Sequence, residues 1–229
     1  MSLPQAEQDA IIERYAGRFR EYGYDPKTLG WDKGKQQIRF SVLTSQYDFR
    51  GKQVLDIGCG FGDLNQMLKH RAGSEYEYRG VDFVPVLIEK AKELYPAESI
   101  RFSCTDILAE NFTGNYDYAV ASGLFNTRFR DFSNYDFIEA VMHKALSLCR
   151  DGLAFDFLSD KVSYHNSQTF HSSPERILGM AYKHSRNIIL RNDYMPFEFA
   201  VFINKDSSFN KEDTIFNHYK SRCLGQSAE

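Results

Sequence analysis

The amino-acid sequence predicts an α/β fold built on a mostly parallel sheet. The apolar run Val54–Ile57 is typical of a short buried strand. Three glycines, Gly58, Gly60 and Gly62, follow it, and a helical pattern then begins at Leu64. In this order of strand, glycine turn and helix, an α/β sheet presents a ligand site at the carboxyl end of its first strand. Apolar runs and helical patterns keep alternating along the rest of the chain.

The length and the net charge of the chain limit the number of domains and the partners to be expected. The chain has 229 residues and a formal net charge of −3, with no basic run. One α/β domain with additions is therefore expected, and nucleic-acid binding has no electrostatic support. The polar start, Met1–Ala10, is unlike a signal peptide, and no apolar stretch reaches membrane-spanning length. We expect a cytoplasmic protein without a membrane partner; the sequence does not indicate an oligomeric state.

The cysteines show no paired spacing of the kind that metal sites use. Cys59, Cys104 and Cys149 lie in apolar runs, and Cys223 lies near the end of the chain. The sequence therefore predicts reduced thiols in the core, with no metal site and no disulfide.

The remaining elements follow from periodicity and turn residues. Apolar residues at helical spacing predict a helix over 5–22, and a turn-rich passage separates it from a second helix over 36–47. The later helices are expected at 84–95, 135–149 and 173–184. The later strands are expected at 77–82, 100–104, 116–122, 153–158, 187–191 and 197–203. The polar end, 205–229, is predicted to be a partly ordered tail with a short helix near 214–219.

The first strand and its glycines resemble a known family motif. The pattern Asp56-x-Gly58-x-Gly60-x-Gly62 after a buried strand resembles motif I of class I S-adenosylmethionine-dependent methyltransferases. The dinucleotide fingerprint G-x-G-x-x-G does not fit, because Asp63 stands three residues after Gly60. The resemblance spans residues 39–203. It implies a single Rossmann-like domain with a seven-stranded, mostly parallel sheet and an antiparallel last strand.

The resemblance also implies an organisation of the chain and a cofactor. It implies a helical N-terminal cap over the cofactor site at 1–50, a methyltransferase core at 51–204 and a C-terminal tail at 205–229. The implied cofactor is S-adenosylmethionine. A vaguer likeness, carried by residues 190–199 and the helix-rich leader, is to small bacterial methyltransferases of unassigned substrate.

Carboxylates after the second and third strands match the family's cofactor contacts. Asp82, twenty residues beyond Gly62, is expected to accept hydrogen bonds from the ribose hydroxyls, although an Asp that caps a helix also fits. The resemblance makes Asp106 the acceptor for the adenine amino group and the Ile107 N–H a donor to the ring, with a plain turn as the alternative for Asp106. Phe83 is expected against adenine or ribose. The other candidate cofactor residues are Asp56, Gly58, Cys59, Gly60 and Ser122.

Arg39 and Asn126 are further candidates. In the leader, Trp31 and Phe40 are interpreted as hydrophobic packing. A cap arginine at position 39 is expected to pair with the cofactor's carboxylate through two donors. After the fourth strand, Ser122–Phe125 stands where many base and amide N-methylating enzymes have an Asn-Pro-Pro-Tyr type signature. This departure weakens nucleic-acid bases and protein Gln as acceptors. Asn126 either orients the acceptor or the cofactor, or caps the following turn.

Two later loops are predicted to carry the acceptor side. The sixth strand is expected to be parallel, so the loops with Tyr164-His165 and Asp193-Tyr194 are predicted on the same sheet edge as the glycine turn. His165 and Asp193 are the candidate bases, with a surface histidine as the alternative for His165.

Three hypotheses remain open from sequence. The first is methyl transfer to a small-molecule acceptor of unknown identity. The second keeps the cofactor but cyclises it to azetidine-2-carboxylate with release of methylthioadenosine, with Tyr164 and Tyr194 stabilising the sulfonium. The third is a non-catalytic cofactor-binding module. An NAD(P) oxidoreductase is weaker, because its third glycine is missing.

Overall fold

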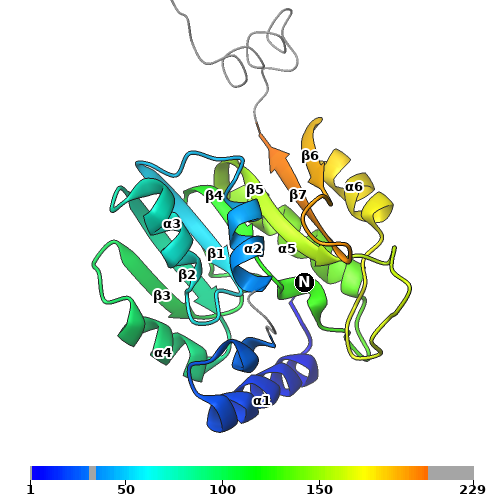
Figure 1. The fold of residues 1–229 in the computed structure, drawn as a ribbon, viewed down its shortest axis with the longest axis horizontal. Helices are drawn as coiled ribbons and strands as arrows, with labels where there is room; N and C mark the ends of the chain where they lie inside the picture. Colours follow the sequence, from blue (N-terminus) through cyan, green and yellow to red (C-terminus); the bar gives the residue numbers. More distant parts are fainter. Residues whose placement is uncertain (1, 31–34, 206–229) are drawn as a thin grey trace, which may run out of the picture.

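A seven-stranded sheet forms the centre of the computed structural model, which describes residues 2–30 and 35–205 (Figure 1). The strand order is β3-β2-β1-β4-β5-β7-β6. The strands are β1 (Lys52–Ile57), β2 (Tyr76–Asp82), β3 (Ile100–Cys104), β4 (Tyr116–Ala121), β5 (Cys149–Leu158), β6 (Asn187–Arg191) and β7 (Glu198–Asn204). The helices are α1 (Gln5–Tyr22), α2 (Lys35–Leu43), α3 (Leu64–Ala72), α4 (Pro85–Leu94), α5 (Asn134–Leu148) and α6 (Pro174–Tyr182), with 3-10 turns η1 (Pro26–Leu29) and η2 (Leu124–Asn126).

The strand directions confirm the predicted sheet. Strands β1 to β5 pair in parallel, and β7 pairs antiparallel with both β5 and β6. Strand β6 therefore runs parallel to β5, as expected. The chain moves outward from β1 to β3, then returns to the other side of β1 for β4. Between β1 and β4 lies the switch point at which open α/β sheets bind ligands.

Both faces of the sheet are covered, which explains why its central strands are nearly continuous apolar runs. In β1 the last four residues, 54–57, are all buried. Helices α2 and α3 contribute side chains such as Leu43 and Leu68 to the core on one face. Helices α5 and α6 contribute Val141 and Ile177 to the core on the other face.

The helices before β1 lie at the carboxyl edge of the parallel strands. Helix α1 contacts α4, and its first turn is fixed to the loop after β4. There Glu7 Oε1 accepts hydrogen bonds from the backbone N–H groups of Arg130 (2.7 Å) and Asp131 (3.0 Å). Leu3 and Ile11 are buried beside this contact. Trp31 and the predicted helix near 214–219 lie outside the described residues.

Two boundaries differ from the prediction because aromatic and sheet contacts decide them. Helix α2 ends at Leu43 rather than near 47, since Tyr47 stacks on Tyr118 with ring centroids 4.1 Å apart and donates to the Leu153 carbonyl. Strand β5 begins at Cys149, and the expected turn at Gly152 is part of the strand, where it pairs with β7.

One cysteine differs from the prediction. Cys59 and Cys149 are buried free thiols, as predicted, but Cys104 is exposed. Strand β3 is an edge strand and Cys104 is its last residue, so Cys104 is exposed although it lies two positions from the buried Phe102. Cys223 lies outside the described residues. Within residues 2–30 and 35–205, no three His, Cys, Asp or Glu side chains are grouped as metal ligands would be.

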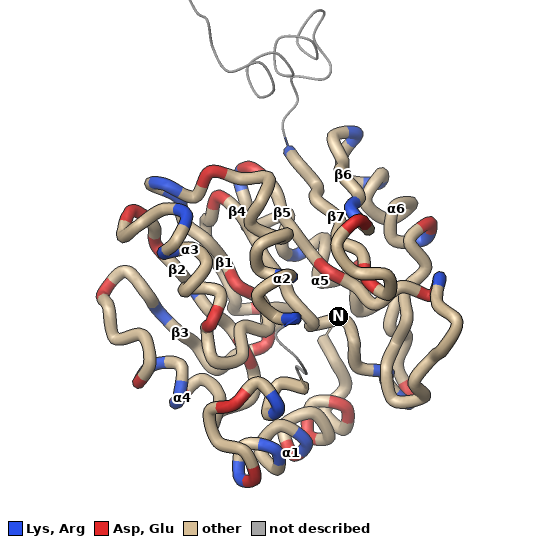
Figure 2. Tube along the Cα trace, in the orientation of Figure 1, with Lys and Arg blue, Asp and Glu red and all other residues tan. Residues whose placement is uncertain are grey.

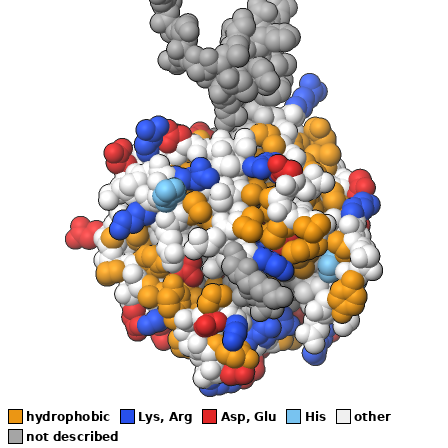
Figure 3. All heavy atoms as spheres, in the orientation of Figure 1, with side chains coloured by type: hydrophobic (Ala, Val, Ile, Leu, Met, Phe, Trp, Pro, Cys, Tyr) orange, Lys and Arg blue, Asp and Glu red, His pale blue; other side chains and the backbone are white. Residues whose placement is uncertain are grey.

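The surface carries no single-sign stripe in the views shown. Figure 2 shows basic and acidic positions interspersed around the fold. In Figure 3 the hydrophobic side chains on this face lie in small groups separated by charged ones. Among the described helices, none has the length and apolar character needed to cross a membrane.

Candidate functional site

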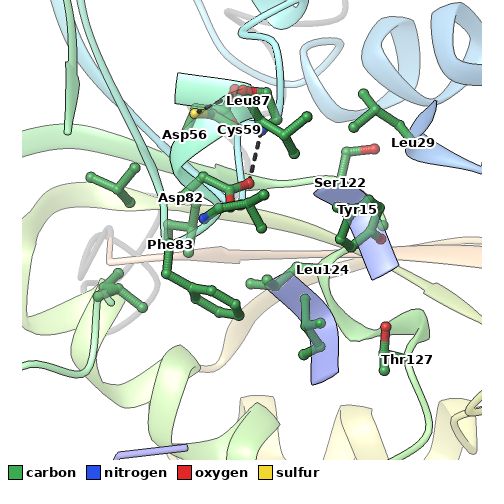
Figure 4. A pocket seen from close by; sticks show the side chains of 18 of the residues that line it. Tyr15, Leu29, Asp56, Cys59, Asp82, Phe83, Leu87, Ser122, Leu124 and Thr127 are labelled. Carbon is green, nitrogen blue, oxygen red and sulfur yellow. Dashed lines mark hydrogen bonds between the residues drawn. The ribbon is translucent and has the colours of Figure 1, made fainter. Parts of the chain in front are cut away.

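A pocket that is partly open to solvent lies where β1, β2, β3 and β4 end (Figure 4). Nine of the ten predicted cofactor residues line it: Asp56, Gly58, Cys59, Gly60, Asp82, Phe83, Asp106, Ile107 and Ser122. The carboxyl ends of adjacent parallel strands bring these positions together, although they are separated by up to 66 residues in sequence (122 − 56).

The glycine turn approaches its neighbours too closely for side chains. The N–H groups of Gly58 and Cys59 donate to the Val81 carbonyl, which fixes the turn to the end of β2. Gly58 has a φ of 69°, and a Cβ there would lie 2.9 Å from Leu124 Cδ1. Glycine at position 58 is therefore required by both backbone conformation and packing.

Asp56 is a buried carboxylate beneath this turn, only 4% exposed. The Tyr78 hydroxyl donates to its Oδ2 at 2.6 Å. Burial raises the pKa of Asp56 to about 7; the hydrogen bond from Tyr78 opposes the rise, and the charge of Asp82 adds to it. The carboxyl is thus poised to change charge near neutral pH.

Asp82 connects the end of β2 to the glycine turn. Its Oδ2 accepts from the Gly60 N–H at 3.0 Å, and its Oδ1 accepts from the Val84 N–H at 2.9 Å. Burial raises its pKa, and these backbone donors oppose the rise. Each oxygen retains acceptor capacity toward the pocket. Asp82 thus combines a local contact with a place in the pocket lining, but it does not cap helix α4, whose N-cap residue is Val84.

Asp106 offers an acceptor without a protein donor. Its Oδ1 accepts from the Leu108 N–H at 2.9 Å, whereas its Oδ2 is buried and has no hydrogen-bond partner among the described residues. An unsatisfied buried acceptor costs free energy, so such atoms are usually satisfied by a ligand or water. Ile107 and Phe83 line the same part of the pocket wall as neighbours of Asp106 and Asp82 in sequence.

The end of β4 is held by a carboxylate from β5. The Ser122 hydroxyl donates to Asp156 Oδ2 at 2.7 Å, and the Gly123 N–H donates to Asp156 Oδ1 at 2.6 Å. Asp156 is 2% exposed, and burial raises its pKa while the nearby Arg39 guanidinium opposes that rise.

Arg39 does not line the pocket, in contrast to its predicted role. Its guanidinium is buried and donates to both carboxylate oxygens of Glu198 at the start of β7. These two residues are 159 positions apart, so sequence spacing gave no sign of the pair. The contact of Arg39 with the cofactor carboxylate stays a prediction; in this structure the ion pair with Glu198 fixes helix α2 to the antiparallel end of the sheet.

The predicted acceptor-side residues lie on the expected sheet edge but outside the pocket lining. Tyr164 is 77% exposed, and the exposed His165 ring contacts His171 with centroids 4.7 Å apart. The carbonyl of Asn126 accepts from the Phe170 N–H at 2.9 Å, and the Asn126 Oδ1 is buried without a hydrogen-bond partner among the described residues. Loop direction was thus predictable, whereas the depth of each side chain was not.

The predicted residues of the β6–β7 loop also lie on the expected sheet edge but outside the pocket lining. Asp193 is exposed and pairs with Arg191 at 2.9 Å, which holds the pKa of Asp193 below its ordinary value. Tyr194 is directed inward, and its hydroxyl lies in the field of Asp156 and Arg39; burial raises its pKa. Neither side chain lines the pocket.

Sequence reasoning missed the pocket residues contributed by the leader. Leu3, Ile11 and Tyr15 line the pocket from the N-terminal segment, and Figure 4 shows the Tyr15 side chain among those that line it. Burial, followed by the charge of Asp82, raises the pKa of Tyr15. The helical spacing of Ile11 and Tyr15 was visible, but it predicted a buried face without showing what that face covers. Leu29, Gln36, Thr127 and Phe129 were also missed.

The strand order, the glycine turn after β1 and the carboxylates after β2 and β3 define a class I Rossmann-like methyltransferase fold. Residues 54–152 match the sequence model of the family described as "Methyltransferase domain". A Mycobacterium tuberculosis protein named as a methyltransferase, Rv1506c, is 27% identical over 67% of this chain and 93% of its own length. A malonyl-[acyl-carrier protein] O-methyltransferase of Anoxybacillus flavithermus is 32% identical over 41% of this chain and 43% of its own length.

Solved structures agree in fold. Magnesium protoporphyrin IX methyltransferase from Synechocystis with bound SAM has a TM-score of 0.61 at 16% identity, covering 89% of this chain and all of that chain. Human N-acetylserotonin methyltransferase in complex with SAM has a TM-score of 0.65 at 13% identity, covering 90% of this chain and 61% of the human chain. The comparisons therefore match this chain to methyltransferases, over residues 54–152 in the family model and over most of the chain in fold.

Proposed function

We propose that this enzyme transfers the methyl group of S-adenosylmethionine, held in the pocket at the carboxyl ends of β1 to β4, to a small-molecule acceptor. The observation that carries the proposal is the unsatisfied Oδ2 of Asp106 in the same pocket as the glycine turn and Asp82. A nucleoside presents an amino group, which is a donor for the unsatisfied Asp106 Oδ2, and two ribose hydroxyls, which are donors for the remaining acceptor capacity of Asp82.

Six of the predicted cofactor residues have a direct role in this proposal. Asp82 accepts from the ribose hydroxyls and Asp106 from the adenine amino group. The Ile107 N–H donates to the ring, and Phe83 lies against adenine or ribose. Gly58 and Gly60 let the backbone approach the amino-acid part of the cofactor. We also propose that residues 1–50 are the cap, 51–204 the core and 205–229 a tail.

The chain's own residues orient the reactants and limit the access of water. The bound cofactor supplies a methyl group that its sulfonium charge already activates. Leu3, Ile11, Leu124 and Phe129 give the pocket an apolar wall, which disfavours water beside the reacting atoms. The buried carboxyl of Asp56, when ionised, favours a cationic ligand over a neutral one.

The cyclisation hypothesis gains no support from the site. The hypothesis assigned the contacts with the sulfonium to Tyr164 and Tyr194, but Tyr164 is exposed and Tyr194 does not line the pocket. Incubation with S-adenosylmethionine alone separates the hypotheses: unchanged cofactor fits methyl transfer, whereas methylthioadenosine without an acceptor would establish cyclisation. Transfer of a deuterated methyl group to any small metabolite of an extract, with release of S-adenosylhomocysteine, would exclude the non-catalytic module.

Substitution of Asp82 tests the cofactor assignment. Asp82→Ala should weaken S-adenosylhomocysteine binding by about 2 kcal/mol, roughly 30-fold, because the ribose hydroxyls lose a charged acceptor. Isothermal titration calorimetry measures the affinity, and circular dichroism checks the fold. Asp48→Ala is the control, since exposed Asp48 likewise accepts from a backbone N–H, that of Arg50 at 3.1 Å, far from the pocket. Unchanged affinity in Asp82→Ala would remove Asp82 from the site.

A further inference from the structure

The Ser122–Gly123 turn has a single buried carboxylate behind it. Asp156 uses one oxygen for the Ser122 hydroxyl and the other for the Gly123 N–H. Gly123 has a φ of 72°, a conformation that leaves the following residue, Leu124, directed at the glycine turn. We propose that Asp156 is a positioning residue, which sets the pocket wall through these two hydrogen bonds and thereby governs cofactor affinity; this inference rests on the proposed function.

The contact between two loops explains why a buried strand residue reaches the ligand site. Leu124 Cδ1 would lie 2.9 Å from a Cβ at position 58, so Leu124 packs directly on the glycine turn. Ser122, Gly123 and Leu124 all line the pocket, whereas Asp156 does not. A shift of the turn by a few tenths of an ångström therefore changes the shape of the pocket, because close-packed groups cannot absorb it.

The contact is suited to an ionised carboxylate. Its two oxygens accept from the Ser122 hydroxyl and the Gly123 N–H, and the charge strengthens both hydrogen bonds. In an asparagine, the oxygen can still accept from the Gly123 N–H and the NH₂ group can donate to Ser122 Oγ, so Asp156→Asn removes the charge and reverses one hydrogen bond. The positive charge of Arg39 stabilises the ionised carboxylate of Asp156 electrostatically. The same guanidinium donates hydrogen bonds to Glu198.

The test is a double-variant cycle in cofactor affinity. Asp156→Asn should weaken S-adenosylhomocysteine binding by at least about tenfold, the effect of losing charge-assisted hydrogen bonds that order the wall. Ser122→Ala should weaken it by a smaller factor. Because Asp156 acts partly through Ser122, Asp156→Asn should weaken S-adenosylhomocysteine binding by a smaller factor in the Ser122→Ala variant than in the parent.

Asp117→Asn is the matched control. Asp117 is also a buried carboxylate, 6% exposed, and accepts from the Gln53 N–H (2.8 Å) and from Arg150 Nε (3.0 Å), but at the amino edge of the sheet. Its loss should lower the melting temperature and leave affinity unchanged, so a general loss of stability is separated from positioning. If Asp156→Asn does not fold, Ser122→Ala still tests the inference in one direction, because parent-like affinity would show that the bond between Ser122 and Asp156 does not set the pocket.

Three outcomes would overturn the inference. Parent-like affinity in Asp156→Asn, or in Ser122→Ala, would show that the bonds do not set the pocket. Effects that add fully in the double variant would show that Asp156 does not act through Ser122. A parent protein that binds no S-adenosylhomocysteine would refute the proposed function itself, and the inference with it.

Discussion

Asp56→Asn should make the protein more stable at alkaline pH and remove part of its pH dependence. Asp56 is buried beneath the glycine turn, where its ionised form is poorly solvated. The amide oxygen of asparagine can still accept from the Tyr78 hydroxyl, so the substitution removes the charge and keeps the hydrogen bond.

The size and sign follow from the pKa. The Asp56 pKa rises from an ordinary value of 3.8 to about 7 on folding, so the folded state binds the proton more tightly than the unfolded state does. The favourable contribution of the protonated carboxyl is complete below the unfolded pKa and is lost as pH rises toward 7. At 1.36 kcal/mol per pKa unit the full effect is about 4 kcal/mol, of which about 3 kcal/mol falls between pH 5 and pH 8.

Urea unfolding of the parent and Asp56→Asn at pH 5 and pH 8 measures this difference. The parent should lose about 3 kcal/mol more unfolding free energy across this interval than the variant does. Asp82 and Asp156 also have raised pKa values, but they contribute to both proteins and cancel in the comparison. Equal pH dependence in the two proteins would show that the Asp56 carboxyl titrates near its ordinary pKa, and the reasoning from burial would fail.

Two further substitutions test the fold that holds the site. Arg39→Ala should lower the free energy of unfolding by about 3–5 kcal/mol, because it leaves the buried Glu198 carboxylate without its cation. Unfolding in guanidinium chloride measures this difference, and a loss below about 1 kcal/mol would contradict a buried ion pair. Gly62→Ala should destabilise the protein by on the order of 2 kcal/mol, since φ is 78° there and a Cβ would lie 2.6 Å from the Phe102 ring. Gly179→Ala is the control in helix α6, where no atom lies within 4 Å of the added Cβ, and it should stabilise by up to about 1 kcal/mol.

The sequence by itself determined the parallel sheet and the cofactor half of the pocket. Short stretches of sequence specify both features. A buried run such as 54–57 followed by glycines defines a strand and a turn, and a carboxylate at the carboxyl end of the next parallel strand lies at the same edge of the sheet. Asp56, Asp82 and Asp106 could therefore be assigned to one edge without knowledge of any contact between them.

Only the tertiary structure determined which side chains from distant segments contact the residues at that edge, and which of them line the pocket. Arg39 meets Glu198 and Asp156 meets Ser122 through pairings across more than 30 positions, and no periodicity carries information about such partners. Tyr15 reaches the pocket because α1 packs on α4, whereas Tyr164 remains in solvent although its loop follows a strand on the same edge. Chain direction places a loop, but side-chain depth depends on packing between elements, which a single sequence does not encode locally.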